Sequence, residues 1–157
     1  LLRGSLSVEL KKRMVKALVW SVALYGSETW TMTAEEVKRL EAFEMWIWRR
    51  MCRISWTDHI TNEEVLRRVG EKRSLMQTIR VRQKNWIGHV LRGNCLLRTV
   101  LEGRLQGKHR RGRPRKKMLD WMLKEGNATK SYSRLKREAQ DRDLWRRHQQ
   151  DLPLAEN

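Results

Sequence analysis

A run of basic residues from Gly103 to Leu119 offers the clearest chemistry in the chain, because it contains no acidic residue. Guanidinium and ammonium groups bind phosphate oxygens and release the counterions condensed on nucleic acid. The cations of this basic segment are candidate nucleic-acid contacts: Arg104, Lys108, Arg110, Arg111, Arg113, Arg115, Lys116 and Lys117. A block of like charges repels itself, so we expect residues 102–117 to form a disordered linker.

The sequence Arg111-Gly112-Arg113-Pro114 lies at the centre of the basic segment. Pro114 favours an extended conformation of Arg113, and Gly112 adds no side-chain bulk. Two arginines on a thin extended ribbon suit the narrow minor groove of A·T-rich DNA, and the tetrapeptide resembles the core of an AT-hook. The alternative is a generic basic linker that contacts phosphates of any sequence, and both interpretations stay open.

A helix expected over residues 74–92 carries a second group of cations. Apolar side chains recur on one face of this helix, and the cations lie largely on the other. Together with the residue that precedes the helix, they are further candidate phosphate contacts: Arg73, Arg80, Arg82, Lys84, His89 and Arg92. Gly88 inside the helix predicts a close packing contact or a bend, because glycine is about 1 kcal/mol less favourable there than alanine.

The sequence shows no convincing catalytic or metal-binding group. Six residues separate Cys52 from His59 and five separate His89 from Cys95, whereas zinc sites use tighter pairs. Glu64 is expected to cap a helix rather than to bind a metal. Glycine loops for phosphate and nucleophile elbows are missing as well. We therefore predict no catalytic residue, no metal, no cofactor, no small-molecule substrate and no enzymatic activity of the chain on its own.

Eight tryptophans are several times the usual number for this length. Trp46, Trp48 and Trp86 fall on or beside apolar stripes, which predicts that they pack in the core. The sequence leaves Trp30, Trp56 and Trp121 open. Aromatic side chains interleaved with arginines are also suited to stacking on unpaired bases.

The 157 residues carry 35 Lys and Arg against 18 Asp and Glu, a net charge of +17. This excess predicts a nucleic-acid partner, whether RNA, DNA or a hybrid duplex. A solvated basic protein and a membrane-surface protein are the alternatives. Two cysteines make no disulfide framework, and no apolar run is long enough to span a membrane. Without a signal peptide, we expect a nuclear or cytoplasmic ribonucleoprotein that is not secreted. Leu1 in place of Met indicates a fragment of a longer protein.

Helical signals dominate the chain. Capping boxes are predicted at Thr33 with Glu36, at Thr61 with Glu64 and at Ser74 with Gln77. We predict an all-α fold of about five to six helices in a partly open array, over residues 7–25, 33–53, 61–70, 74–92, 114–126 and 133–149. The second half of the first helix is apolar nearly all round, so we expect it to be buried.

Six segments carry a family resemblance: residues 24–31 (LYGSETWT), 39–44 (RLEAFE), 48–51 (WRRM), 54–66 (ISWTDHITNEEVL), 86–92 (WIGHVLR) and 110–121 (RRGRPRKKMLDW). In this order they resemble the region that follows the polymerase domain in reverse transcriptases of non-LTR retrotransposons (LINEs). The nearest lineages are the RTE and jockey-like endonuclease–reverse transcriptases. Met118 departs from the pattern, because an aromatic residue is commoner there.

The resemblance implies a division of the chain into the end of the polymerase thumb (1–30), a helical extension (31–101), the basic linker (102–117) and a short helical tail (118–157). It implies template RNA, target DNA and an upstream polymerase domain as partners. The Y/F-A-D-D turn that holds the catalytic metals of the family, its endonuclease and the Cys–His knuckle of related elements are missing from this sequence. The alternatives are a helical module that docks on a polymerase body, or an AT-hook-like DNA-binding protein derived from the element.

Overall fold

The computed structural model describes residues 4–102, 118–125, 128–129 and 131–150. The fold is all-α, as predicted. The described residues form two compact units. Unit 1 comprises the chain up to Ser27 and the range Thr33–Ile79, and unit 2 comprises Glu28–Met32 and the chain from Arg80 onward. Of the linker predicted over 102–117, Glu102 is described as a turn, and residues 103–117 lie outside the described residues.

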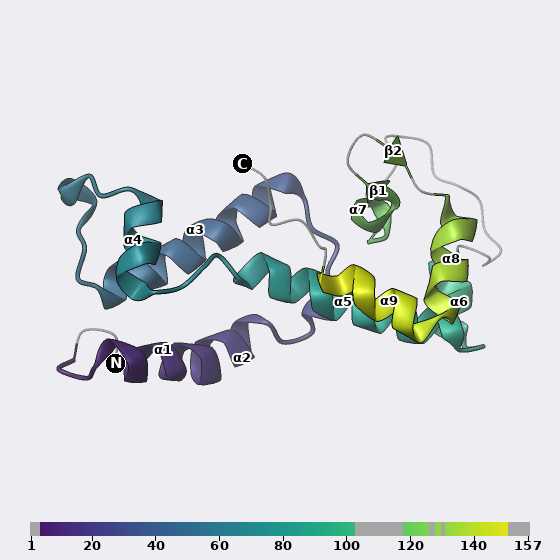
Figure 1. The fold of residues 1–157 in the computed structure, drawn as a ribbon, viewed down its shortest axis with the longest axis horizontal. Coiled ribbons are helices and arrows are strands. Elements are labelled where there is room, and N and C mark those ends of the chain that lie inside the picture. Colours follow the sequence, from purple (N-terminus) through teal and green to yellow (C-terminus); the bar gives the residue numbers. More distant parts are fainter. Residues whose placement is uncertain (1–3, 103–117, 126–127, 130, 151–157) are drawn as a thin grey trace. The chain divides into compact units, whose positions relative to one another are not determined.

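Unit 1 is built from the helices of the first half of the chain. Helices α1 (Val8–Met14) and α2 (Trp20–Ala23) flank a π-helical turn at Val15–Val19, and together they replace the single helix predicted over 7–25. Helices α3 (Ala34–Met51) and α4 (Asn62–Val69) follow and lie against each other (Figure 1). Helix α5 (Leu75–Arg92) begins in unit 1 and continues in unit 2.

The helix starts show how far local signals determine the structure. At α3 the capping box is complete, because Thr33 Oγ1 accepts from the Glu36 amide at 3.3 Å and Glu36 Oε2 accepts from the Thr33 amide at 2.6 Å. At α4 only half of the predicted box forms. Thr61 Oγ1 accepts from the Glu64 amide at 3.4 Å, while the Glu64 carboxylate binds two arginines in the next turn of the helix.

Tryptophans hold the core of unit 1 together. Trp48 is fully buried, and the Trp20 ring packs edge-on against it with 5.7 Å between the ring centroids. The prediction that Trp46 is also a core residue is wrong, since Trp46 is 48% exposed. The cause is geometric, because residues two apart on a helix point in nearly opposite directions.

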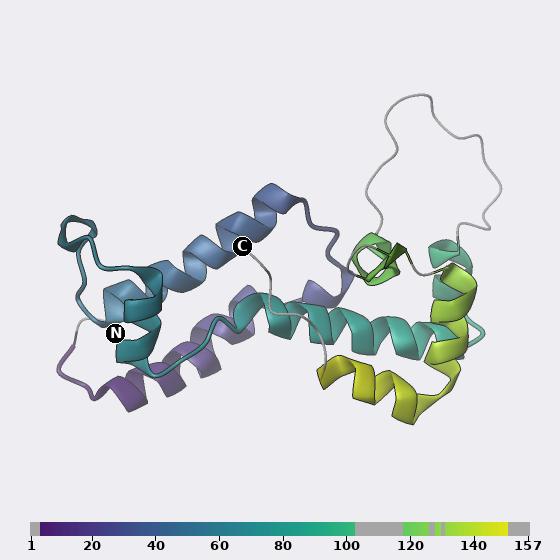
Figure 2. The same ribbon diagram turned by 45° about the horizontal axis from the view of Figure 1, so that its top comes forward.

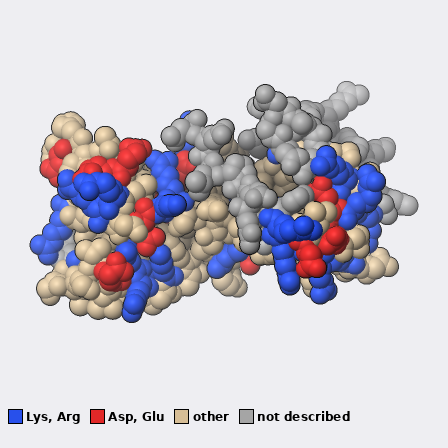
Figure 3. Space-filling view, in the orientation of Figure 1, with Lys and Arg blue, Asp and Glu red and all other residues tan. Residues whose placement is uncertain are grey.

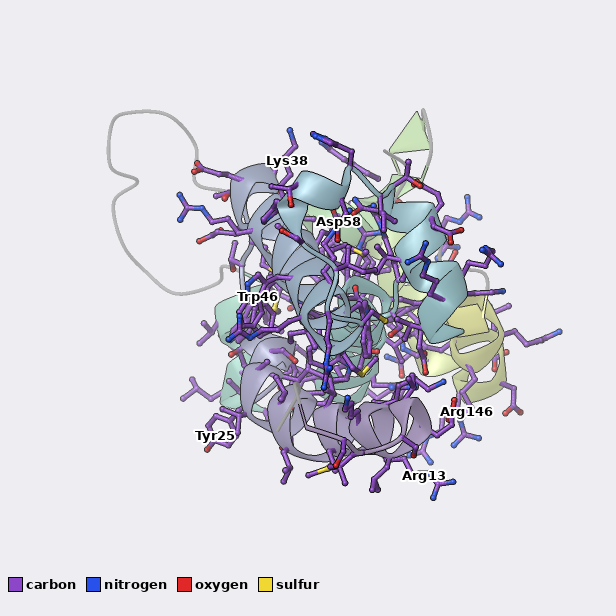
Figure 4. The ribbon with its side chains drawn as sticks, turned by 90° about the vertical axis from the view of Figure 1, so that its left-hand side faces the viewer. Arg13, Tyr25, Lys38, Trp46, Asp58 and Arg146 are labelled. Carbon is purple, nitrogen blue, oxygen red and sulfur yellow. The ribbon has the colours of Figure 1, made fainter. Side chains whose placement is uncertain are left out.

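The prediction that the second half of the first helix is buried is also wrong. Trp20 and Leu24 are buried, but Leu18, Val22 and Tyr25 are exposed, Tyr25 at 85%. Figure 4 shows the Tyr25 ring projecting away from the protein. Only one side of this helix packs on the rest of unit 1, so an apolar strip of α1 and α2 faces solvent.

Unit 2 contains the second part of α5 and the short elements that follow it. These are α6 (Leu96–Leu101), α7 (Asp120–Leu123), α8 (Tyr132–Gln140) and α9 (Arg142–Gln150), together with two-residue antiparallel strands β1 (Lys124–Glu125) and β2 (Ala128–Thr129). Helix α9 runs beside α5 (Figure 2). The core of this unit consists of Ile87, Leu91, Leu119, Met122, Leu135, Ala139 and Trp145.

Three predictions for unit 2 need correction. Helix α6 and the β1–β2 pair had no counterpart in the sequence prediction. Within the described residues, the helix predicted over 114–126 is reduced to the single turn of α7. The helix predicted over 133–149 is two helices, because Asp141 adopts an extended conformation and its Oδ1 accepts from the amides of Asp143 and Leu144 at 2.9 and 3.0 Å. This cap starts α9 in a new direction.

Candidate nucleic-acid interface

The candidate contacts predicted from the sequence are distributed unequally over the structure. The eight in the basic segment, Arg104, Lys108, Arg110, Arg111, Arg113, Arg115, Lys116 and Lys117, lie outside the described residues. Arg73 belongs to unit 1, and Arg80, Arg82, Lys84, His89 and Arg92 belong to unit 2. Figure 3 shows basic side chains over the surface of unit 2, with fewer acidic side chains among them.

The prediction that Lys84 lies on an open, phosphate-contacting face of α5 is wrong. The residue is 9% exposed, and its ammonium lies 5.3 Å from the centre of the Trp145 ring. The Lys84 carbonyl accepts a hydrogen bond from Trp145 Nε1 at 3.0 Å. Lys84 therefore stabilises the packing of α9 on α5 through the ring of Trp145. Helix α9 covers a face of α5 that the sequence pattern predicts to be polar.

The remaining cations of α5 differ in their surroundings. The Arg80 guanidinium lies 5.7 Å from the centre of the half-buried Trp121 ring, and Arg82 is exposed. Arg73, just before α5, is half-buried, and its positive charge acts to lower the pKa of the Glu44 carboxyl. None of these three side chains lines the pocket described next.

His89 and Arg92 do meet in one place. They line a pocket of about 280 Å³ between α5 and α9, and Asn85, Trp145, Arg142 and Arg146 complete its wall. We call it the arginine pocket. Spacing explains its construction, because residues at positions i and i+4 share one face of a helix and Arg142 and Arg146 have this spacing on α9. Trp145 anchors α9 to α5 between them.

Charge in the arginine pocket is unbalanced. Burial, followed by the positive charges of Arg142 and Arg146, lowers the pKa of Arg92. The Arg92 guanidinium donates to the Ala139 carbonyl at 2.8 Å, which fixes its position. None of the lining residues is acidic. A concave site with three guanidinium groups has the charge and the hydrogen-bond donors that suit an anion.

The sequence missed Arg142 and Arg146 because the predicted helix over 133–149 had a weak apolar stripe and no internal break. The signal that identifies them is Asp141, which is an N-cap residue followed by a tryptophan four positions later. The Asp141 carboxylate already accepts from the first free amides of α9, so an anion in this pocket is bound by side chains and not by the end of the helix.

Metal chemistry finds no support in the described part of the chain. There, no group of three or more His, Cys, Asp and Glu side chains is placed to hold a metal ion. Cys52 and His59 belong to unit 1, and His89 and Cys95 belong to unit 2. Burial raises the pKa of the Cys52 thiol. Among the same described residues, no helix is long and apolar enough to cross a membrane.

Comparisons with known proteins add no further assignment. No protein-family model, no curated protein and no solved structure matches this chain. The argument for function therefore depends on the residues themselves.

Proposed function

We propose that this chain is a nucleic-acid-binding C-terminal piece of a non-LTR retrotransposon reverse transcriptase, and that it binds template RNA or target DNA through their phosphates. The arginine pocket carries this proposal. It brings together Arg92, Arg142 and Arg146 with no acidic residue in its lining, and burial and the charges of Arg142 and Arg146 both act on Arg92. A phosphate relieves both effects, because its oxygens accept the guanidinium N–H groups and neutralise their charge.

Two sequence features support the same function. The net charge of +17 favours any polyanion, and the basic segment adds eight cations to those of the arginine pocket. Residues 24–121 resemble, in the same order, the region after the polymerase domain of these reverse transcriptases. This resemblance supports a role in the ribonucleoprotein of a mobile element, in the nucleus or the cytoplasm. In this proposal the chain binds and positions nucleic acid, while catalysis and metal ions belong to an upstream polymerase domain.

Salt-dependent binding tests the proposal. The chain is titrated with an A·T-rich duplex, a matched G·C-rich duplex and a structured RNA over a range of salt concentrations. Each phosphate contact adds about 0.9 to the slope of log affinity against log salt concentration. Replacing Arg142 and Arg146 by Ala is therefore expected to reduce the slope by about 2 on all three ligands.

The matched control removes two arginines that are already paired. Arg67 and Arg68 donate to the Glu64 carboxylate at 2.7 and 2.8 Å, so their replacement by Ala removes the same formal charge without removing an anion site. An equal loss in both double variants would mean that net charge alone drives binding. Absence of binding to all three ligands at moderate salt would overturn the proposal.

The exposed apolar strip of unit 1 favours one second candidate, a helical module that docks on the polymerase domain. Leu18, Val22 and Tyr25 are exposed at 55%, 78% and 85%, and a strip of this kind is typical of a protein interface. Under this function the chain expressed alone aggregates, and fusion to an upstream polymerase domain makes it soluble. Replacing Leu18 and Val22 by Glu is expected to abolish that aggregation; persistent aggregation of the double variant would argue against docking through this strip.

A further inference from the structure

A second pocket lies in unit 1, where α3 ends. It has a volume of about 600 Å³ and is lined by Trp46, Arg49, Arg50, Arg53, Ile54, Ser55 and Trp56. We call it the tryptophan–arginine pocket. Its two aromatic residues are both exposed, Trp46 at 48% and Trp56 at 78%. Tryptophan is usually well buried, so two exposed indoles in one concave site need an explanation.

The backbone after α3 holds Trp56 in place. Arg53 and His59 have left-handed φ values of 58° and 48°, which are uncommon for residues other than glycine. Between them a 3-10 turn at Trp56–Asp58 is closed by a capping box, in which Asp58 Oδ2 accepts from the Ser55 amide at 2.7 Å. Strained residues on both sides of a capped turn indicate a fixed loop conformation. Figure 4 shows this turn, marked by Asp58, and Trp46 at the surface of α3.

Arg49 of α3 binds the far end of the loop that carries Trp56. Its guanidinium donates to the Ile60 carbonyl at 2.6 Å and to Asn62 Oδ1 at 3.0 Å, and it lies 5.1 Å from the centre of the Trp56 ring. Arg50 likewise lies 5.3 Å from the centre of the Trp46 ring. Each indole thus has an arginine at one face, while much of its surface stays open to solvent. A rigid aromatic ring backed by a cation is a platform for another flat π-system.

The charge of the pocket selects among flat ligands. Three arginines and no acidic residue line it. A ligand that combines an aromatic ring with a negative charge matches both features, and a nucleotide is such a ligand. In a duplex the faces of the bases are covered by their neighbours, whereas an unpaired base exposes its face for stacking.

We infer that the tryptophan–arginine pocket binds an unpaired nucleotide of single-stranded RNA or DNA. The base stacks against the open indole surfaces of both Trp56 and Trp46, and the adjacent phosphate lies against Arg50 and Arg53. This inference rests on the proposed binding of nucleic acid, and it adds a second site that distinguishes single strands from duplexes. The arginine pocket of unit 2 has no exposed aromatic platform of this kind, and its proposed ligand is phosphate.

The test compares two labelled oligonucleotides of equal length and charge, an unstructured oligo(dT) and a hairpin duplex, on the full chain. Trp56→Leu keeps the apolar bulk and removes the aromatic face, and Trp46→Leu does the same for the second ring. Each variant is expected to weaken oligo(dT) binding about tenfold and to leave hairpin binding unchanged. Trp56→Phe retains an aromatic face, so it is expected to retain most of the affinity. Circular dichroism verifies that the variants fold, which the exposure of both rings favours.

The outcomes separate this inference from the proposed function. If the parent chain binds the hairpin with a steep salt slope but the Leu variants bind oligo(dT) as the parent does, the stacking site is overturned and the phosphate-binding function stands. If the Leu variants lose affinity for both ligands equally, the pocket does not select unpaired bases and the inference is again overturned. If the parent chain binds neither ligand, both fail. Selective loss of oligo(dT) binding in Trp56→Leu with rescue in Trp56→Phe supports the stacking site.

Discussion

Gly88 of α5 lies directly against the indole of Trp145 in α9, so closely that a Cβ at this position would overlap the ring. The absence of a side chain lets Trp145 Nε1 reach the Lys84 carbonyl, at 3.0 Å. The contact holds α9 on α5, and the arginine pocket is built from these two helices. A glycine that weakens α5 locally therefore positions the site.

Gly88→Ala is expected to lower the free energy of unfolding of unit 2 by about 1–3 kcal/mol, the usual range for forced overpacking. A loss of stability is informative, because alanine otherwise stabilises the interior of a helix by about 1 kcal/mol relative to glycine. Urea unfolding of parent and variant measures the difference. Gly93→Ala is the control, since the atoms nearest to a Cβ there are 3.7 Å away or farther. Equal or greater stability of Gly88→Ala would contradict the close contact.

Local signals predicted the long helices well. Thr33 caps α3, and Gly70 ends α4 with a φ of 68°. The capping box predicted at Ser74 with Gln77 needs correction, because the Ser74 amide donates to the Glu44 carboxylate of α3 at 2.9 Å. These features depend on residues within one or two turns, which a sequence displays directly. Helix α6 was not predicted, because it is only six residues long and the side chain of Cys95 before it makes no capping hydrogen bond.

The candidate sites depended on contacts between distant residues. His89 and Arg92 were found on α5, but the arginines opposite them come from α9, whose packing no local pattern specifies. The pattern of α5 places Lys84 on its polar side, and no local feature of the sequence indicates that Trp145 covers it. For the same reason the sequence did not decide between burial and base stacking for Trp56.

Glu64 predicts a pH dependence of the stability of unit 1. Hydrogen bonds from Arg67 and Arg68 hold the pKa of its carboxyl at about 2, below the ordinary value of 4.5. The pKa is depressed in the folded state, so the ion pairs contribute their full stability above pH 4.5 and lose it as the pH falls from 4.5 toward 2. Unfolding midpoints across this range measure the loss, which Glu64→Gln is expected to reduce.

The control for this prediction is Glu63→Gln. Glu63 lies beside Glu64 in the first turn of α4, and it is exposed. The variant removes an equal charge from the same turn, so it corrects for the general acid sensitivity of the chain. An identical pH profile in Glu64→Gln and Glu63→Gln would mean that the arginine pairs do not stabilise the fold.

Glu44 predicts a link between α3 and the start of α5 inside unit 1. Its side chain is 1% exposed, and its carboxylate accepts from the amides of Ser74 and Leu75 at 2.9 and 3.3 Å. Glu44→Ala leaves these amides without an acceptor in a buried place, which is expected to lower the free energy of unfolding by about 1–3 kcal/mol. Denaturant titration measures the change. Glu41→Ala, one turn earlier on α3, is expected to have little effect, and an equal loss in both variants would refute the cap.

Arg111 and Arg113 predict how the basic segment contributes to binding. Replacing both by Ala is expected to reduce the salt slope by about 2 on the A·T-rich and the G·C-rich duplex alike, because two phosphate contacts are lost. The unfolding midpoint should stay unchanged, because the two arginines belong to a block of like charges that contributes little apolar surface to a core. Lys116→Ala with Lys117→Ala removes the same charge from the same segment. If only the arginine variant loses affinity, and only for the A·T-rich duplex, the uniform-contact prediction fails and the Arg-Gly-Arg-Pro sequence acts as a minor-groove hook.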